Sequence, residues 1–553
     1  MTTKAAAPSI NEIRNAAEGM LSSGGPAAAL EYLLTALASL LNKNRNLEML
    51  VAKLERAKFG RSSERIDADQ LSLLFDTLCR ESAAQGEPVP GMSPNAEVEN
   101  QTDAALTEEI EGARKDELVA RKKRRKKKSD RVKARNVETV HHHEKVADSE
   151  RCCSRCGKQK GCLSEDVTRI LEYQPARFIE HLYHRENLAC GKCKDEVTTA
   201  VAPKRILPRS DAGASLLAHL VVSKYADHCP LHRLHRIFGR AGVDLPVSTM
   251  SDWIAGTAGL LRPIVDRLVE RMPSAHVIGT DATGLLVLDP DAAKNIVRGT
   301  IWSIVLDGRD VVFRYAKKGD GLSGPWKFLA GRQGYVQADG ANVFDRLYNG
   351  EVASAIEVGC WCHGRRRLEA IKDVDCRAAY PLRLIGRLFR IETLANLRGF
   401  DADQRKQLRQ ERSAPTLATL GTWVKATVAN EPPTSALAKA AGYLKNQWTA
   451  LGRFLEDGRL RLDNMEVEQQ LRDVALGRKN FLFAGSHEAA ERAADIYSLT
   501  RTCALRKVPL LPYFTDVLRK LGDGWPGDRF EELTPDRWLE LYGAEFKPPD
   551  DDS

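Results

Sequence analysis

The sequence predicts a multidomain α+β protein whose core contains a mixed β-sheet, and three observations lead to this prediction. Leucines recur every seven residues near the N-terminus, two Cys-x-x-Cys pairs follow, and apolar β-branched runs then alternate with helical segments. A chain of 553 residues is longer than one hydrophobic core usually organises. Its content of 43% hydrophobic and 29% charged residues is typical of a folded protein rather than a disordered one.

The apolar runs argue against a membrane protein and against a secreted one. None of them is long enough to span a bilayer, so no membrane partner is expected. The N-terminal stretch MTTKAAAPSINEIRN lacks the apolar centre of a signal peptide, which predicts a cytoplasmic location. In the cytoplasm the 12 cysteines are expected to be thiols or metal ligands rather than disulfides.

The N-terminal leucines predict a coiled-coil helix over residues 28–60. These leucines are Leu33, Leu40, Leu47 and Leu54. The other seam positions, which alternate with them, include the polar Asn44. A polar seam residue of this kind fixes the register and number of helices, so we expect a homodimer or a higher homo-oligomer. The alternative is an amphipathic helix that packs within its own chain.

A linker with a basic tract is predicted over residues 83–137. Its first part is rich in Ala, Glu, Pro and Gly, which indicates disorder. Residues 121–135 then contain eleven Lys or Arg and one Asp, including Lys122, Lys123, Arg124 and Arg125. Such a tract is suited to nucleic-acid phosphates. The alternative is a linker that only keeps the chain in solution.

A zinc-binding, ribbon-like β domain is predicted over residues 138–205. Each Cys-x-x-Cys turn directs two thiolates at one point, and two turns complete a tetrahedral Zn²⁺ site. The predicted ligands are Cys153, Cys156, Cys190 and Cys193, while Cys152 and Cys162 remain alternative ligands. The residues between the two pairs alternate in polarity as strands do.

A helical domain with a helix-turn-helix outline is predicted over residues 211–270. The segment PLHRLHRIFGRAG indicates one helix closed by Gly242, and STMSDWIAGTAGLL indicates a second helix with Ser248 as its cap. The second helix is then the candidate reader of a DNA groove. An ordinary helical hairpin gives the same pattern.

The predicted core, residues 273–370, begins with three strands joined as a meander. HVIGTDATGLLVLD, NIVRGTIWSIVLDG and RDVVFRYA supply them, and Asp307-Gly308 marks a hairpin. A helix, the strand GYVQADG, a short helix and the strand AIEVGCWCH follow. This is the order of the ribonuclease H-like fold, in which helices flank a mixed sheet.

Two aspartates are expected to converge in this core. Asp281 lies within the first strand, and Asp339 ends the fourth, which is its neighbour. Paired carboxylates hold the two Mg²⁺ or Mn²⁺ ions of phosphoryl-transfer sites, and a third acid usually joins them from a later helix. Residues 371–460 predict a helical insertion, residues 461–500 the final core helix and residues 501–545 a C-terminal helical region. The final helix offers Asp463, Glu466 and Glu468.

Several blocks resemble the insertion sequence 66 family of bacterial transposases, namely VIGTDATG, GYVQADGANVFDRLY, GCWCHGRRRLEA and LDNMEVEQQLRDVALGRKNFLFAGS. The resemblance covers most of residues 28–520. It implies a DDE transposase that binds terminal inverted repeats and target DNA at the bacterial nucleoid, in some cases with small accessory proteins. The family's acidic triad falls on Asp281, Asp339 and Glu468, which leaves Asp463 as a helix N-cap and Glu466 outside the site.

The sequence departs from the family pattern around this triad. ATG follows Asp281 where the family usually has Glu-Thr-Pro, and Met465, Gln469 and Asp473 replace the usual Asn, Arg and Pro. Basic residues near the acids are candidate contacts to DNA phosphates, namely Arg365, Arg366, Arg367, Arg472, Arg478 and Lys479.

Two other functions fit the same motifs. One is a catalytically decayed DNA-binding regulator of the same origin, and the other is a ribonuclease H-like nuclease or resolvase that does not transfer strands.

Overall fold

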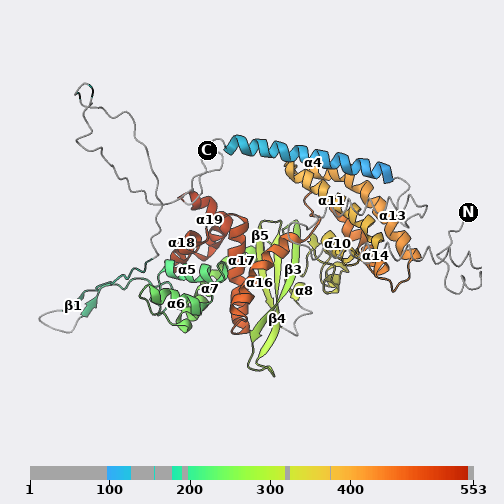
Figure 1. Cartoon of the computed structure of the whole chain (residues 1–553). Helices are drawn as coiled ribbons and strands as arrows, with labels where there is room; N and C mark the ends of the chain where they lie inside the picture. Colours follow the sequence, from blue (N-terminus) through green and yellow to red (C-terminus); the bar gives the residue numbers. More distant parts are fainter. Residues whose placement is uncertain are drawn as a thin grey trace, which may run out of the picture. The chain divides into compact units, whose positions relative to one another are not determined.

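The computed structural model describes residues 96–125, 155, 158, 177–189, 197–317, 324–373 and 375–545 (Figure 1). The chain divides into two compact units, Met1–Met92 and Ser93–Ser553, and every described residue belongs to the second. The predicted coiled coil at 28–60 lies outside the described residues. So do the predicted zinc ligands Cys153, Cys156, Cys190 and Cys193 and their alternatives Cys152 and Cys162.

A long helix, α4 (Ala96–Arg125), occupies much of the segment predicted to be a disordered linker, so that prediction was wrong for these residues. The Ala and Glu that suggested disorder are also strong helix formers. Leu106 and Ile110, four positions apart, are buried against helix α11 (Ala379–Leu397). Lys122–Arg125 form the C-terminal end of α4.

The described part of the predicted zinc-binding region contains two short strands, β1 (Asn187–Ala189) and β2 (Val197–Thr199). They pair antiparallel, with Leu188 opposite Thr198.

Three helices precede the core, namely α5 (Ala214–Tyr225), α6 (Leu231–Arg240) and α7 (Val247–Glu270). As predicted, α6 ends before Gly242, whose φ of 83° suits the residue after a helix. The predicted cap of α7 was wrong, because the helix begins at Val247 and Pro246, not Ser248, is its N-cap residue. The fixed φ of proline suits a helix start.

The core is a five-stranded mixed sheet in the order β5-β4-β3-β6-β7, which confirms the predicted mixed sheet, its initial meander and the pairing of the first strand with the fourth. The antiparallel meander comprises β3 (Val277–Leu288), β4 (Ile296–Leu306) and β5 (Asp310–Ala316). The strands β6 (Tyr335–Gln337) and β7 (Ile356–Val358) run parallel to β3. The β4–β5 turn has positive φ at Asp307 (49°) and Gly308 (66°), as a tight hairpin requires.

Short helices follow the last three strands, namely α8 (Gly324–Leu329) after β5, a 3₁₀ turn (Asn342–Phe344) with α9 (Asp345–Tyr348) after β6, and α10 (Trp361–Glu369) after β7. The last strand is shorter than expected. AIEVGCWCH was predicted to be extended throughout, but its strand ends at Val358 and α10 begins at Trp361.

The segment predicted to be an insertion is helical and has a hydrophobic core of its own, which includes Leu384, Leu420 and Leu444. After a 3₁₀ turn (Cys376–Ala378) it comprises α11, α12 (Ala402–Leu408), a π-helical turn (Arg409–Ser413), α13 (Ala414–Asn430), α14 (Ala436–Asn446) and α15 (Trp448–Gly452), and ends in a 3₁₀ turn (Arg453–Leu455).

The last helices return to the sheet (Figure 1). Helix α16 (Met465–Phe481) packs on β3, and α17 (His487–Leu505) packs on β5. They are followed by α18 (Leu510–Gly522), a 3₁₀ helix (Gly527–Leu533), α19 (Pro535–Leu541) and a last 3₁₀ turn (Gly543–Glu545). One continuous core joins these helices to the sheet and to α5–α7. Among the described helices, none combines the length and the apolar character that crossing a bilayer requires.

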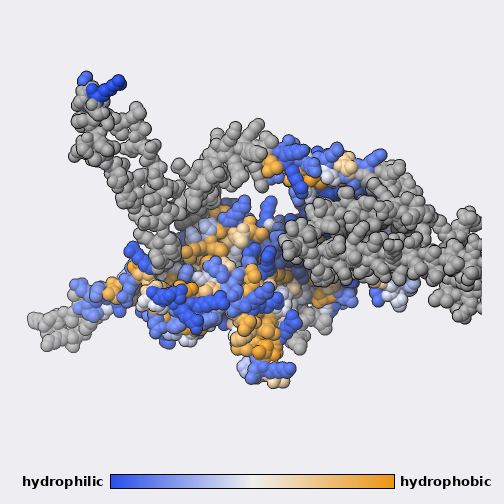
Figure 2. All heavy atoms as spheres, viewed as in Figure 1, coloured by the Kyte–Doolittle hydropathy of each residue, from blue (hydrophilic) through white to orange (hydrophobic). Residues whose placement is uncertain are grey.

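The face shown in Figure 2 is largely hydrophilic, with apolar surface near the outer end of the β3–β4 pair. Leu286 and Ile296, which pack near this end, are each 43% exposed.

Candidate active site

Two of the three predicted acids lie on neighbouring strands. Asp281 is in the middle of β3, opposite Ser303 of β4. The parallel neighbour β6 pairs with β3 as far as Gly279 and Gln337, and Asp339 follows two residues later. Gly340, with a φ of 75°, then turns the chain away from the sheet. The end of β6 therefore leaves Asp339 beside the strand that carries Asp281.

The third predicted acid, Glu468, lies on α16. This helix is held against β3 by the buried side chains of Val467, Leu471 and Val474. Glu468 has a side chain that is 36% exposed, and its Oε1 lies 3.9 Å from Arg366 of α10. Glu466 points elsewhere, because its carboxylate lies 3.4 Å from the guanidinium of Arg461.

The charges of the three predicted acids interact. The pKa of Asp281 is raised to about 6, chiefly by burial and also by the negative charges of Asp339 and Glu468, while the Ala282 N–H and His363 oppose the rise. Asp281 therefore binds its proton more tightly than an exposed aspartate. A bound cation would oppose both causes of the raised pKa.

The donor chemistry of these residues fits a divalent metal ion, since Mg²⁺ and Mn²⁺ prefer carboxylate oxygens. Within the described ranges, however, no three His, Cys, Asp or Glu side chains are grouped closely enough to hold an ion as they stand. Glu468 is turned toward Arg366, a cation on a neighbouring helix.

The predicted N-cap at Asp463 was wrong, because Asn464 is the N-cap residue of α16. Asp463 Oδ1 instead accepts a hydrogen bond from the N–H of Met465, the first helical residue, at 3.0 Å. The side chain of Asn464 does not cap its own helix: Nδ2 donates to the Thr280 carbonyl at 3.0 Å. Sequence reasoning missed this contact, which joins α16 to the residue before Asp281.

A second group adjoins the acids at the start of α10. Hydrogen bonds from Cys362 and His363 lower the pKa of the buried Cys360 thiol, and that thiol in turn raises the pKa of His363. Trp361 is fully buried and donates through Nε1 to the Leu451 carbonyl at 2.9 Å, so it supports the insertion rather than reaching the acids.

The basic residues predicted near the site differ in their surroundings. Arg365 pairs with Glu369 at 2.7 Å, and the guanidinium of Arg367 lies 4.2 Å from the ring centre of Tyr443. Arg478 donates to Thr283 Oγ1 at 3.0 Å and to the Gly284 carbonyl, so it binds β3. The exposed basic side chains on α16 are Arg472 and Lys479.

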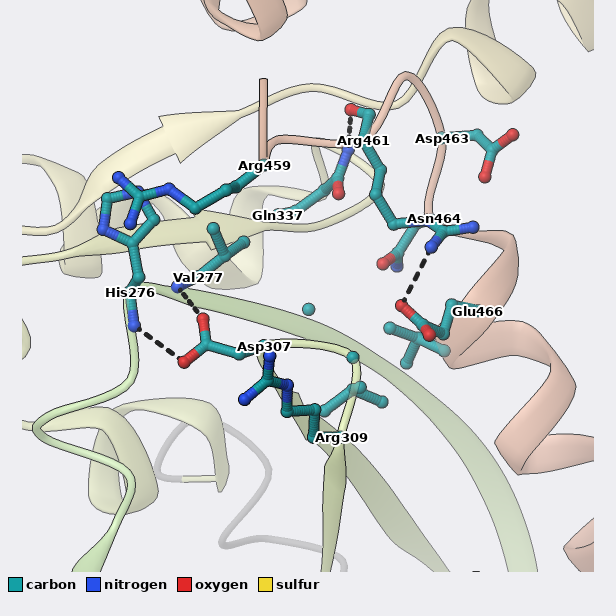
Figure 3. A pocket seen from close by; sticks show the side chains of 14 residues that line it. His276, Val277, Asp307, Arg309, Gln337, Arg459, Arg461, Asp463, Asn464 and Glu466 are labelled. Atoms are coloured by element: carbon teal, nitrogen blue, oxygen red, sulfur yellow. Dashed lines mark hydrogen bonds and ion pairs between the residues drawn. The ribbon is translucent and has the colours of Figure 1, made fainter. Parts of the chain in front are cut away.

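A cavity of about 350 Å³ lies between β3, the β4–β5 turn and the segment that leads into α16 (Figure 3). Its lining includes Gly279 of β3 and Asp463, Asn464 and Glu466 at the start of α16. Asp281, Asp339 and Glu468 are not among its lining residues. The cavity therefore borders β3 just before Asp281 and the start of the helix that carries Glu468.

Three of the departures from the family pattern lie on α16. Met465 and Gln469 are both exposed on α16. Asp473 forms an ion pair with Arg501 of α17 and so fastens α16 to its neighbour.

Comparison with protein families places these elements in one group. A model described as "Transposase IS66 family" matches residues 209–492. A model of the leucine-zipper segment, described as "Transposase C of IS166 homeodomain", matches residues 46–134, and "zinc-finger binding domain of transposase IS66" matches residues 150–194.

Whole-chain relatives occur in Sinorhizobium fredii (strain NBRC 101917 / NGR234). The uncharacterized protein y4hP is 30% identical over 90% of this chain and 89% of its own length. The uncharacterized protein y4qI is 28% identical over 89% of this chain and 88% of its own length. With three family models in the expected order and a relative that spans nearly the whole chain, this protein belongs to the IS66 family of transposases.

Proposed function

We propose that this transposase is an active DDE enzyme that cuts the ends of an insertion sequence and joins them to target DNA by metal-dependent phosphoryl transfer. The observation that carries the proposal is that Asp281, Asp339 and Glu468 lie on adjoining elements. They lie on β3, just after its neighbour β6 and on the helix packed against β3, and the charges of Asp339 and Glu468 act on Asp281. A buried carboxyl group with a raised pKa, such as that of Asp281, is typical of functional sites.

The fold of the core supports this proposal. The sheet has an antiparallel meander followed by two parallel strands, which is the order that a ribonuclease H-like core requires. In that fold the catalytic acids lie on the first strand, after the fourth strand and on a late helix, which correspond here to β3, β6 and α16.

Two Mg²⁺ or Mn²⁺ ions, when held by these three carboxylates, would supply the Lewis acid that activates a water or a 3′-hydroxyl. The chain itself orders the acids and places cationic groups near them. Arg366 of α10 lies beside Glu468. Arg472 and Lys479 are exposed on α16, the helix that carries Glu468, where they would be accessible to DNA phosphates.

The DNA-binding part of the proposal concerns α6 and α7. They form a helix, a turn and a second helix, and the start of α7 is exposed at Val247 and Ser248. The N-terminal residues of a recognition helix are those that contact base edges. We assign α7 to the terminal inverted repeats, together with a zinc site at Cys153, Cys156, Cys190 and Cys193 and the basic tract Lys122–Arg125.

Residues 28–60 would pair two or more protomers as a coiled coil, so that both ends of the element are held together. Target DNA is the second nucleic-acid partner, and small accessory proteins of the same element are further candidates. The expected place of action is the bacterial nucleoid.

The test is a cleavage assay on DNA that carries one end of the element, with Asp281→Asn as the variant. We expect end binding to persist and Mg²⁺-dependent cleavage to be lost, because the amide removes one anionic ligand. Asp345→Asn is the matched control, since Asp345 is exposed on α9 near the same sheet. Cleavage that survives in Asp281→Asn refutes the assignment.

The same assay separates the alternatives. A decayed regulator would bind the end but not cut it in the wild-type form. A nuclease would cut it yet give no joined product when pre-cut ends and target DNA are supplied.

A further inference from the structure

The segment Arg461–Asn464, directly before α16, is tied to three elements that lead to the three predicted ligands. Gln337 Nε2 donates to the Arg461 carbonyl at 2.9 Å, and Gln337 lies two residues before Asp339. Asn464 Nδ2 donates to the carbonyl of Thr280, the residue before Asp281. The N–H of Glu468 donates to the Asn464 carbonyl at 3.2 Å.

The corner between β7 and α10 completes the junction. Gln337 Nε2 also donates to the Gly359 carbonyl at 3.2 Å, and the Trp361 N–H donates to the Leu462 carbonyl at 3.0 Å. The Asn464 N–H donates to the Cys360 sulfur at 3.3 Å. Both amide side chains are buried, with Gln337 and Asn464 each 2% exposed.

Neither amide side chain is needed to form its own helix or strand. Helix α16 begins without a side-chain hydrogen bond from Asn464 to its own first turn, and Gln337 is the last residue of β6. Both donors reach across to carbonyls that are distant in sequence. The Thr280 carbonyl lies just beyond the last β3–β6 pair, Gly279 with Gln337, and Asn464 supplies a donor to it from α16.

We propose that Gln337 and Asn464 are positioning residues that set the separation of Asp281, Asp339 and Glu468 and thereby the metal affinity of the site. This inference rests on the proposed function, because it requires the three acids to be the metal ligands. Residues that orient ligands from outside the coordination sphere commonly change metal affinity 10–100-fold when they are replaced. Neither amide touches the metal or DNA in this scheme.

The test measures Mn²⁺ binding to the full-length chain without DNA, from the loss of the free Mn²⁺ signal in electron paramagnetic resonance. Asn464→Leu and Gln337→Met remove the amide donors at nearly constant volume. We expect each to weaken Mn²⁺ binding at least about tenfold. Each variant loses buried hydrogen bonds and should melt at a somewhat lower temperature, but its affinity for an end-containing DNA should stay close to wild type. Asn480→Leu is the matched control, because Asn480 lies on the same helix and its Nδ2 donates to Leu476 of that helix.

Three outcomes are informative. Weakened Mn²⁺ binding in both amide variants, with an unchanged control, supports the inference. Wild-type Mn²⁺ affinity in both variants, when Asp281→Asn has lost it, overturns the inference and leaves the proposed function standing. Equal Mn²⁺ binding by wild type and Asp281→Asn overturns the proposed function and the inference with it. If Asn464→Leu does not fold, Asn464→Ala, which also removes the donor, takes its place under the same criteria.

Discussion

At the scale of single residues, the site depends on a carboxyl group whose environment disfavours its charge. Asp281 is paired to β4 on one side and approached by α16 on the other, and its pKa is raised to about 6. The folded protein therefore binds the proton of this group more tightly than the unfolded chain does. Between the ordinary aspartate pKa of 3.8 and about 6, stability falls as the pH rises.

The direction of this pH dependence gives a prediction for the stability of the metal-free protein. Asp281→Asn should raise its stability by roughly 1–3 kcal/mol at pH 7.5, where the wild-type carboxylate is charged, and should have little effect near pH 4. Melting curves at the two pH values in EDTA measure the difference. Mg²⁺ should then reduce the gap at pH 7.5, because it stabilises only the carboxylate form. Equal melting temperatures of wild type and variant at pH 7.5 would contradict the raised pKa.

A second residue-scale prediction concerns the contact between β3 and α16. A Cβ at Gly279 would lie 2.6 Å from Val467 Cγ2 and 3.2 Å from Asn464 Oδ1, so the helix must shift. Gly279→Ala should cost about 1–3 kcal/mol and reduce cleavage. The control is Gly386→Ala in α11, where a Cβ meets nothing within 4 Å and the helix should gain roughly 0.5–1 kcal/mol. Chemical denaturation and the cleavage assay together measure both effects.

At the scale of elements, the strands were predictable and the role of α4 was not. The β-branched runs of β3, β4 and β5 carry a strong local signal, and the spacing of the strands indicated which of them are neighbours. The contacts of Asn464 and α4 depend on partners far along the chain. Thr280 is 184 positions from Asn464, and Arg387 of α11 is 284 positions from Asp103 of α4. A local sequence pattern does not indicate which distant residue a side chain will contact.

Helix α4 is polar along most of its surface, so its docking depends on a narrow interface. Leu106 is 3% exposed against α11, and the carboxylate of Asp103 accepts hydrogen bonds from Arg387 and Arg390, each at 2.6 Å. Glu109 pairs with Arg412 at 3.0 Å. An apolar centre with ion pairs on either side explains why a segment with few large apolar groups is ordered.

The docking of α4 gives an element-scale prediction. Leu106→Ala removes the buried centre of the interface and should weaken docking by about 2–4 kcal/mol. Hydrogen exchange should then quicken along α4 while the exchange of β3 and β4 stays unchanged. Leu118→Ala is the control, because Leu118 lies on the same helix and is 53% exposed. Faster exchange in the control variant alone would refute the assigned interface.

At the scale of the whole molecule, the charge distribution favours a polyanionic partner. The net charge is +8, and the basic tract at the end of α4 contributes a disproportionate share of the positive charge. Since α4 is docked on the insertion, the tract begins at a fixed distance from that domain. Non-specific affinity for DNA should therefore depend on the tract and on ionic strength.

The whole-molecule prediction concerns this salt dependence. Replacing Lys122, Lys123, Arg124 and Arg125 by Gln should reduce the slope of log affinity against log salt by about 3–4, because each phosphate contact contributes roughly 0.9. Fluorescence anisotropy with random-sequence duplex DNA at several salt concentrations measures the slope. An unchanged slope would show that these four side chains do not contact phosphates.

The junction at Arg461–Asn464 also has a consequence for protein synthesis. Its hydrogen bonds join residues that are 124 and 184 positions apart, and Glu468 is made long after Asp281 and Asp339. At ~5–20 residues per second, the interval between the first and the third acid is roughly 10–40 s. During that time the nascent chain displays its sheet and insertion without the helix that completes the acid cluster. A prematurely terminated product would therefore keep the segments proposed to bind DNA while lacking one of the three acids.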